Sequence, residues 1–114
     1  YILTIMAAFA LATPAAADYV KVQEAGHFQK LIEGRTLNRL GITLTVSPSG
    51  NIEGRAFGRD VTGDWSWQNG YFCRDLAWGA QDIGYNCQEV RANDNELRFT
   101  SDQGTGESAD FRLR

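Results

Sequence analysis

Short alternating runs separated by turn residues occupy the chain from Thr36 onward, and they constrain its fold more than any other feature. In each run apolar side chains recur at every second position, as Ile42, Leu44 and Val46 do. A period of two places such side chains on one face of a β-strand, and Gly- and Asn-rich connections between runs are typical of hairpins. The pattern predicts seven or eight strands joined by short loops. The clearest runs are ITLTVS (42–47), NIEGRAFG (51–58), VTGDWSWQ (61–68), YFCRDLAW (71–78), IGYNCQEV (83–90), ELRFTS (96–101) and ADFRLR (109–114).

An antiparallel meander of this kind has to close or be covered, because exposed edge strands pair with other chains. We therefore predict a mainly β fold, either a small barrel or a strongly curved sheet. Before the strands, VQEAGHFQKLIEG (22–34) predicts one short amphipathic helix, with Ala25, Phe28, Leu31 and Ile32 on its apolar stripe and Gly34 at its end. This helix is expected to plug or flank the barrel.

The first 17 residues are apolar and uncharged, and Ala15 and Ala17 form an A-x-A pattern before Asp18. Such a segment predicts a signal peptide over 1–17, cleaved after Ala17, and a single β-barrel domain over 18–114 that is periplasmic or secreted. The alternative is a retained anchor, although a membrane span needs roughly 20 apolar residues. After cleavage we expect no membrane span.

The charged residues all follow Ala17, and 14 acidic against 11 basic residues give a net charge of −3. This balance provides no general attraction to nucleic acid, so no nucleic-acid partner is expected.

The two cysteines, Cys73 and Cys87, lie on neighbouring predicted strands. Redox pairs are usually closer in sequence, as in C-x-x-C, and zinc sites need further ligands at short spacing. In an exported domain such a pair favours a cross-strand disulfide, and closing this segment would stabilise the fold by about 3 kcal/mol. No metal ion and no cofactor are predicted.

The two strands that carry the cysteines have two faces, and each face holds a candidate site. Which of the two faces points into the barrel decides which site is interior. On the cysteine face Asp75 and Glu89 would lie with Tyr71 and Tyr85. Paired carboxylates in different environments can act as acid and base, but on an exposed face they are ordinarily solvated.

The opposite face of the same strand carries Arg74 together with Leu76 and Trp78. If this face is interior, Arg74 is a buried cation that needs a partner or an anionic ligand; otherwise its head reaches water. Trp65 and Trp67 share a face and form either an aromatic binding wall or core. The candidate ligand-binding residues are Arg74, Trp65, Trp67, Trp78, Asp75, Tyr85 and Glu89, and no catalytic residue is predicted.

The small residues Gly54, Ala56 and Gly58 recur on one face of a predicted strand. They either make room for Trp65 and Trp67 on the neighbouring strand or leave space for a ligand.

Four segments, LIEGRTL, GITLTVSPSGNIEGRAFGRDVTGDWSWQNGYFCRDLAWG, YNCQEV and LRFTSDQGTGESADFRLR, resemble a group of small exported bacterial proteins without an established function. Some members carry the label dihydrodipicolinate reductase, and this resemblance implies reductase activity as one hypothesis. The chain has no Gly-rich turn between a strand and a helix for a dinucleotide, and His27 is its only histidine. A shorter segment, LNRLGITLTVSPSGNIEGRA, is similar to the first hairpin of avidin-like barrels, which implies a meander barrel.

These observations favour an exported, non-catalytic binding module. Its partner would be a small ligand in the barrel mouth or an envelope protein, such as a hydrolase that it inhibits. The alternatives are an enzyme, in the form of the reductase label, and a structural envelope protein.

Overall fold

The computed structural model describes residues 18–114, so the predicted signal peptide at 1–17 lies outside the described residues. Neither helix in this range is long and apolar enough to cross a membrane. In chain order the elements are β1 (Val20–Lys21), α1 (Ala25–Ile32), β2 (Leu37–Arg39), β3 (Ile42–Val46), β4 (Asn51–Ala56), β5 (Arg59–Gln68), β6 (Tyr71–Trp78), β7 (Gln81–Asn93), β8 (Glu96–Thr100), α2 (Ser101–Gly104) and β9 (Ser108–Leu113).

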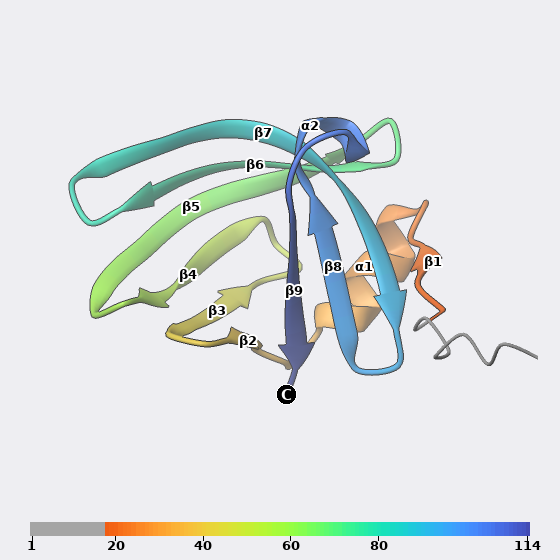
Figure 1. The fold of residues 1–114 in the computed structure, drawn as a ribbon, viewed down its shortest axis with the longest axis horizontal. Coiled ribbons are helices and arrows are strands. Elements are labelled where there is room, and N and C mark those ends of the chain that lie inside the picture. Colours follow the sequence, from red (N-terminus) through yellow and green to blue (C-terminus); the bar gives the residue numbers. More distant parts are fainter. Residues whose placement is uncertain (1–17) are drawn as a thin grey trace, which may run out of the picture.

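Eight strands, β2 to β9, form a closed antiparallel barrel (Figure 1). Each strand pairs with the next along the chain, and β2 also pairs with β9 through Leu37 opposite Leu113 and Asn38 opposite Arg112. The predicted fold class is therefore confirmed: a mainly β meander barrel with an N-terminal helix and one disulfide. The short strand β1, which shows no alternation in the sequence, pairs with β7 outside this closed set.

The long strand β7 changes partner along its length. Its first part pairs with β6 and its last five residues pair with β8. Beside the first part lies α2, where Asn86 Nδ2 donates to Asp102 Oδ1 at 2.8 Å and the Asp102 N–H donates to Asn86 Oδ1 at 2.9 Å. Asp102 and Gln103 have φ values of 54° and 56°, so α2 is a left-handed turn that covers this edge of β7.

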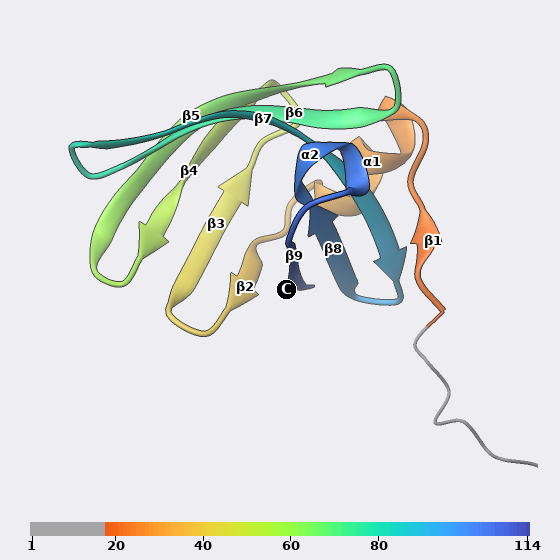
Figure 2. The same ribbon diagram turned by 45° about the horizontal axis from the view of Figure 1, so that its top comes forward.

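The aromatic part of the core lies at the end of the barrel that α1 closes (Figure 2). Phe28 of α1 is completely buried, and its ring centroid lies 5.2 Å from Trp65, 5.1 Å from Trp67 and 5.1 Å from Phe72. The ring of Phe99 on β8 lies 6.3 Å from it, edge-on. The apolar stripe of the helix thus plugs one end of the barrel, as the sequence predicts.

The small residues of β4 do not make room for Trp65 and Trp67, contrary to one of the two predictions. Gly54 lies opposite Leu44 on β3, and a Cβ there would overlap the Thr43 carbonyl oxygen, so glycine permits a close backbone approach. The Ala56 carbonyl accepts a 2.7 Å hydrogen bond from the indole of Trp78, which is therefore the tryptophan beside this strand.

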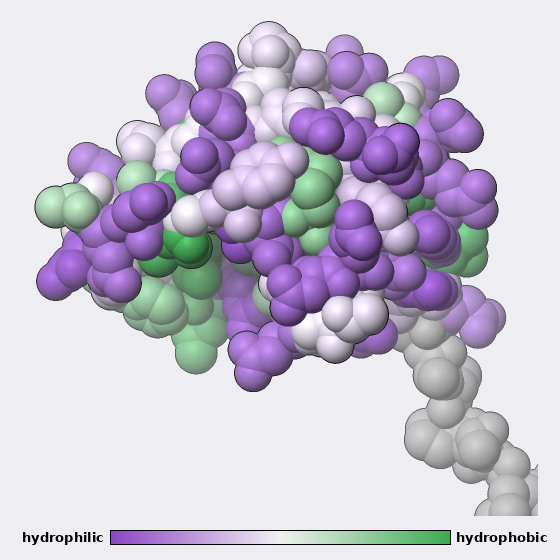
Figure 3. All heavy atoms as spheres, turned by 90° about the horizontal axis from the view of Figure 1, so that it is seen from above, coloured by the Kyte–Doolittle hydropathy of each residue, from purple (hydrophilic) through white to green (hydrophobic). Residues whose placement is uncertain are grey.

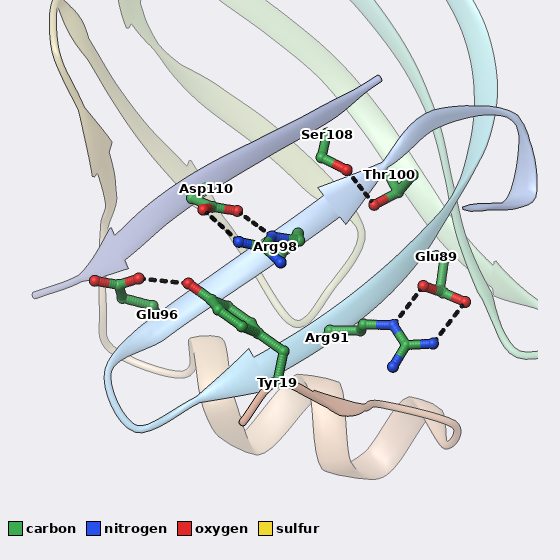
Figure 4. A network of polar contacts seen from close by, with 8 residues as sticks. All are labelled: Tyr19, Glu89, Arg91, Glu96, Arg98, Thr100, Ser108 and Asp110. Atoms are coloured by element: carbon green, nitrogen blue, oxygen red, sulfur yellow. Dashed lines mark hydrogen bonds and ion pairs between the residues drawn. The ribbon is translucent and has the colours of Figure 1, made fainter. Parts of the chain in front are cut away.

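A polar network on the outer surface attaches the N-terminal segment to the barrel (Figure 4). Tyr19 donates a 2.6 Å hydrogen bond to Glu96 of β8. Arg98 lies 4.0 Å from the Tyr19 ring centroid and donates to both carboxylate oxygens of Asp110, at 2.7 and 3.0 Å. Because these contacts link the segment before β1 to β8 and β9, they support the strand arrangement from outside.

This network predicts a small loss of stability in acid. The hydrogen bond from Arg98 holds the pKa of Asp110 below its ordinary value of 3.8. A lowered folded-state pKa means that the stabilisation is present above about pH 4 and is lost as the pH falls through the lower folded value. The pair is more than a third exposed, so we expect a loss of about 0.5 kcal/mol.

Urea unfolding between pH 5 and pH 2, roughly the range over which such a carboxylate titrates, measures this loss. The variant Asp110→Asn should show a correspondingly flatter pH dependence than the unmodified protein. Equal slopes in the two proteins would contradict the prediction.

Candidate ligand-binding site

Two adjoining cavities run through the barrel interior from the core toward the turns at the other end. The inner one has a volume of about 180 Å³ and is lined by side chains that include Phe72, Phe99 and Arg74. The outer one has a volume of about 220 Å³ and reaches Trp78 and Ile83. Both are bordered by Leu44, Leu76 and Phe111, so together they form one mostly apolar space.

Arg74 is the charged side chain of this space. It comes from the middle of β6, and alternation turns it inward together with Phe72 and Leu76, which answers the question of which face of β6 is interior. Its Nη1 donates a 2.8 Å hydrogen bond to the Gly84 carbonyl. Burial lowers the pKa of the half-buried guanidinium, while the charge of Asp75 partly opposes this shift.

No carboxylate within the described range 18–114 lies within salt-bridge distance of Arg74. In the part of the chain that the structure describes, no aspartate or glutamate side chain lines either cavity. The electrostatic environment of the space is therefore set by a cation, although the whole chain has a net charge of −3.

Two further arginines lie toward the open end of the same face. Arg39 is opposite Ile42 and Arg59 is opposite Ala56, and directly opposed residues share a face of the sheet. The guanidinium of Arg59 lies 4.5 Å from the Trp78 ring centroid, and that of Arg39 lies 5.6 Å from the Phe111 ring centroid. Both arginines thus stack on aromatic rings near the mouth.

The prediction of a ligand wall made by Trp65 and Trp67 is wrong, and the alternative, that they are core residues, is correct. Both indoles pack on Phe28 at the closed end of the barrel. Their N–H groups donate to backbone carbonyls, that of Trp65 to Ser47 at 2.9 Å and that of Trp67 to Gln23 at 3.1 Å. Of the predicted tryptophans, Trp78 borders the outer cavity.

The cysteines form the predicted disulfide. Cys73 and Cys87 are directly opposed on β6 and β7, with their Cα atoms 3.9 Å apart. Their face points outward, since the alternate residues on β6 border the cavity.

Asp75 and Glu89 do not come together, so the prediction of a carboxylate pair is wrong. Asp75 lies opposite Tyr85, on one side of the disulfide, whereas Glu89 lies beyond it on the other side. Glu89 lies four positions beyond Tyr85 along β7, a distance of about 13 Å at the rise of a β-strand. Glu89 instead binds Arg91 at 2.7 Å, and Tyr85 is largely exposed.

Several residues around the cavity were not singled out from the sequence, notably Leu44, Phe99 and Phe111. Their alternation indicates buried positions but does not distinguish a packed core from a cavity wall. Leu76 carried a clearer signal, because it shares the face of Arg74.

No protein-family model matches the chain, and no curated protein or solved structure matches it either. The resemblance to small exported bacterial proteins and to the first avidin-like hairpin therefore stays a prediction. The chemistry of the site is argued from the residues of this chain.

Proposed function

We propose that this protein is an exported, non-catalytic binding protein that holds a small amphipathic molecule inside its barrel. The apolar part of the ligand would occupy the two adjoining cavities, and its anionic group would contact Arg74. The observation that carries this proposal is the half-buried guanidinium of Arg74 in a space lined otherwise by uncharged residues.

The energetics of the guanidinium favour an anionic ligand. An arginine offers five N–H donors, and burying them costs free energy unless they find acceptors. Among residues 18–114, Arg74 makes a single side-chain hydrogen bond, to the Gly84 carbonyl. A carboxylate would accept two parallel hydrogen bonds from the free side of the guanidinium, which is the strongest geometry available to this pair.

The cavity dimensions favour a small ligand. The inner cavity of about 180 Å³ is comparable to the roughly 150 Å³ apolar cavity that accommodates benzene in another protein. Together with the outer cavity of about 220 Å³ it lies just above the lower end of the range for ligand sites, roughly 300 Å³. A short fatty acid or an aromatic carboxylate has this size and polarity.

The predicted signal peptide and the disulfide support a periplasmic or secreted location, since structural disulfides persist in oxidising compartments.

The test compares octanoate with octanol, which have the same chain length but differ in charge. Calorimetric titration should show octanoate binding about tenfold more tightly, because hydrogen bonds to a charged group contribute about 1.5–3 kcal/mol. Substituting Arg74→Met should reduce octanoate affinity to that of octanol while leaving octanol binding largely unchanged.

The matched control is Arg55→Met, which removes an outer-face arginine that pairs with Asp60. It should leave both affinities unchanged. Equal binding of octanoate and octanol by the unmodified protein, or undiminished octanoate binding by Arg74→Met, would overturn the proposal.

A further inference from the structure

The open end of the barrel is formed by three neighbouring turns, which we call the turn rim: residues 40–41 between β2 and β3, 57–58 between β4 and β5, and 79–80 between β6 and β7. The Phe57 N–H donates to the Gly41 carbonyl at 2.8 Å, and the Gly79 N–H donates to the Asp60 carbonyl at 2.8 Å. Residues distant in the sequence therefore lie on one connected edge.

Large apolar side chains project from this edge. Leu40 is 93% exposed and Phe57 is 68% exposed, and Ile83, just after the third turn, is 46% exposed. Figure 3 shows hydrophobic side chains gathered at the left end of the molecule, where Figure 1 places the turns of β4–β5 and β6–β7, on an otherwise mainly hydrophilic face. Leu40 and Phe57 lie outside the buried core, so their exposure points to a partner, whereas Ile83 also borders the outer cavity.

Arginines surround these apolar tips. An open cleft of about 430 Å³ beside Leu40 is lined by Arg39, Arg112 and Arg114. Of these, Arg112 forms an ion pair with Glu96 at 3.7 Å.

The carboxylates of the turn rim offset this positive charge only in part. Asp60 is bound by Arg55. Asp82 accepts a 3.0 Å hydrogen bond from the Gly84 N–H, within its own strand. Arg59, which stacks on Trp78, adds a further cation to the same edge.

We propose that the turn rim docks on an anionic lipid bilayer, with Leu40 and Phe57 inserted among the lipids and the arginines of the cleft against headgroup phosphates. Apolar side chains inserted about 5–10 Å deep, flanked by basic residues, are the usual composition of interfacial membrane contacts. A protein partner fits this edge less well. A stable protein interface buries roughly 800 Å² on each side, whereas here the apolar area is confined to separate turn tips.

This surface does not depend on the cavity ligand, but it would turn the mouth of the barrel toward the bilayer. An amphipathic molecule could then pass between lipid and cavity without crossing water.

The test places a fluorescent reporter on the turn rim of the full chain. In Phe57→Trp, the new indole should be quenched about twofold by phosphatidylglycerol vesicles with brominated acyl chains, since it would lie at the boundary between headgroups and acyl chains. The control Ser49→Trp puts the indole on the β3–β4 turn at the opposite end and should show no added quenching. This readout follows one side chain, which matters because the apolar segment 1–17 could itself bind vesicles.

Two further measurements test whether binding depends on the negative charge of the lipid and on the apolar side chain of Leu40. Phosphatidylcholine vesicles should quench the introduced indole of Phe57→Trp far less, and salt at about 1 M should weaken the effect of phosphatidylglycerol, because the Debye length falls to about 3 Å. Substituting Leu40→Ser in the Phe57→Trp protein should reduce quenching, whereas Tyr85→Ser, on the outer face of β7, should not.

Equal quenching of the introduced indoles in Phe57→Trp and Ser49→Trp would overturn the proposal. So would equal quenching of the Phe57→Trp protein by the two lipids. A blue shift in the emission of the Phe57→Trp protein that grows with its concentration without vesicles would assign the rim to a second copy of the chain instead.

Discussion

Replacing Phe28 with alanine is expected to lower the free energy of unfolding by about 3–5 kcal/mol, the range found for deleting a fully buried aromatic ring. Phe28 is completely buried and is surrounded by the rings of Trp65, Trp67, Phe72 and Phe99. Its loss would leave a cavity between α1 and the barrel that these large rings cannot easily fill. For a domain of this size, the melting temperature should fall by about 12 °C or more.

Phe57→Ala is the matched control, because the same side chain is removed from a position that is 68% exposed. Substitutions at such sites usually change stability by about 0.5 kcal/mol or less. Thermal and urea unfolding of both variants measures the difference. Similar stabilities for the two would mean that the helix does not close the barrel as described.

Removing the disulfide is expected to cost about 3 kcal/mol, because the bond closes a segment of some 15 residues and restricts the unfolded chain. Cys73 and Cys87 are directly opposed on β6 and β7, so the native strands need no rearrangement to carry the bond. The double variant Cys73→Ala/Cys87→Ala should therefore unfold at a lower urea concentration, but its far-UV circular dichroism spectrum before unfolding should match that of the unmodified protein.

Dithiothreitol provides the internal control for this prediction. It should lower the urea midpoint of the unmodified protein to about that of the double variant, and it should leave the variant unchanged. A reduced protein that keeps its full stability would contradict a stabilising role for the bond.

The strands were largely predictable from the sequence, because one buried face imposes a period of two. The run 71–78 matches β6, and the runs 42–47 and 51–58 lie within one or two residues of the ends of β3 and β4. β1 and β2 were not predicted, because two or three residues cannot display alternation. Closure through Leu37 and Leu113 joins the two ends of the meander and leaves no local signal in the sequence.

The site was predictable only in part. Arg74 was identified as a possible ligand contact, but whether it faced inward depended on how β6 is placed in the closed barrel. The pairing of Trp65 and Trp67 on one face was visible, yet only the position of Phe28 shows that this face is filled. The separation of Asp75 from Glu89 was itself predictable, because pairing Cys73 with Cys87 on antiparallel strands places Asp75 opposite Tyr85 and Glu89 on the other side of the disulfide.

The join between β2 and β9 is the shortest in the barrel wall. Two pairs of opposed residues hold it, with mutual backbone hydrogen bonds between Thr36 and Arg114 as an extension, whereas β5 and β6 pair over eight positions. Segments with few backbone contacts open locally at a lower free energy than the whole domain. Local opening should therefore part the wall beside Arg39 and Phe111 first, and this would give the interior a second route of exchange besides the mouth of the barrel.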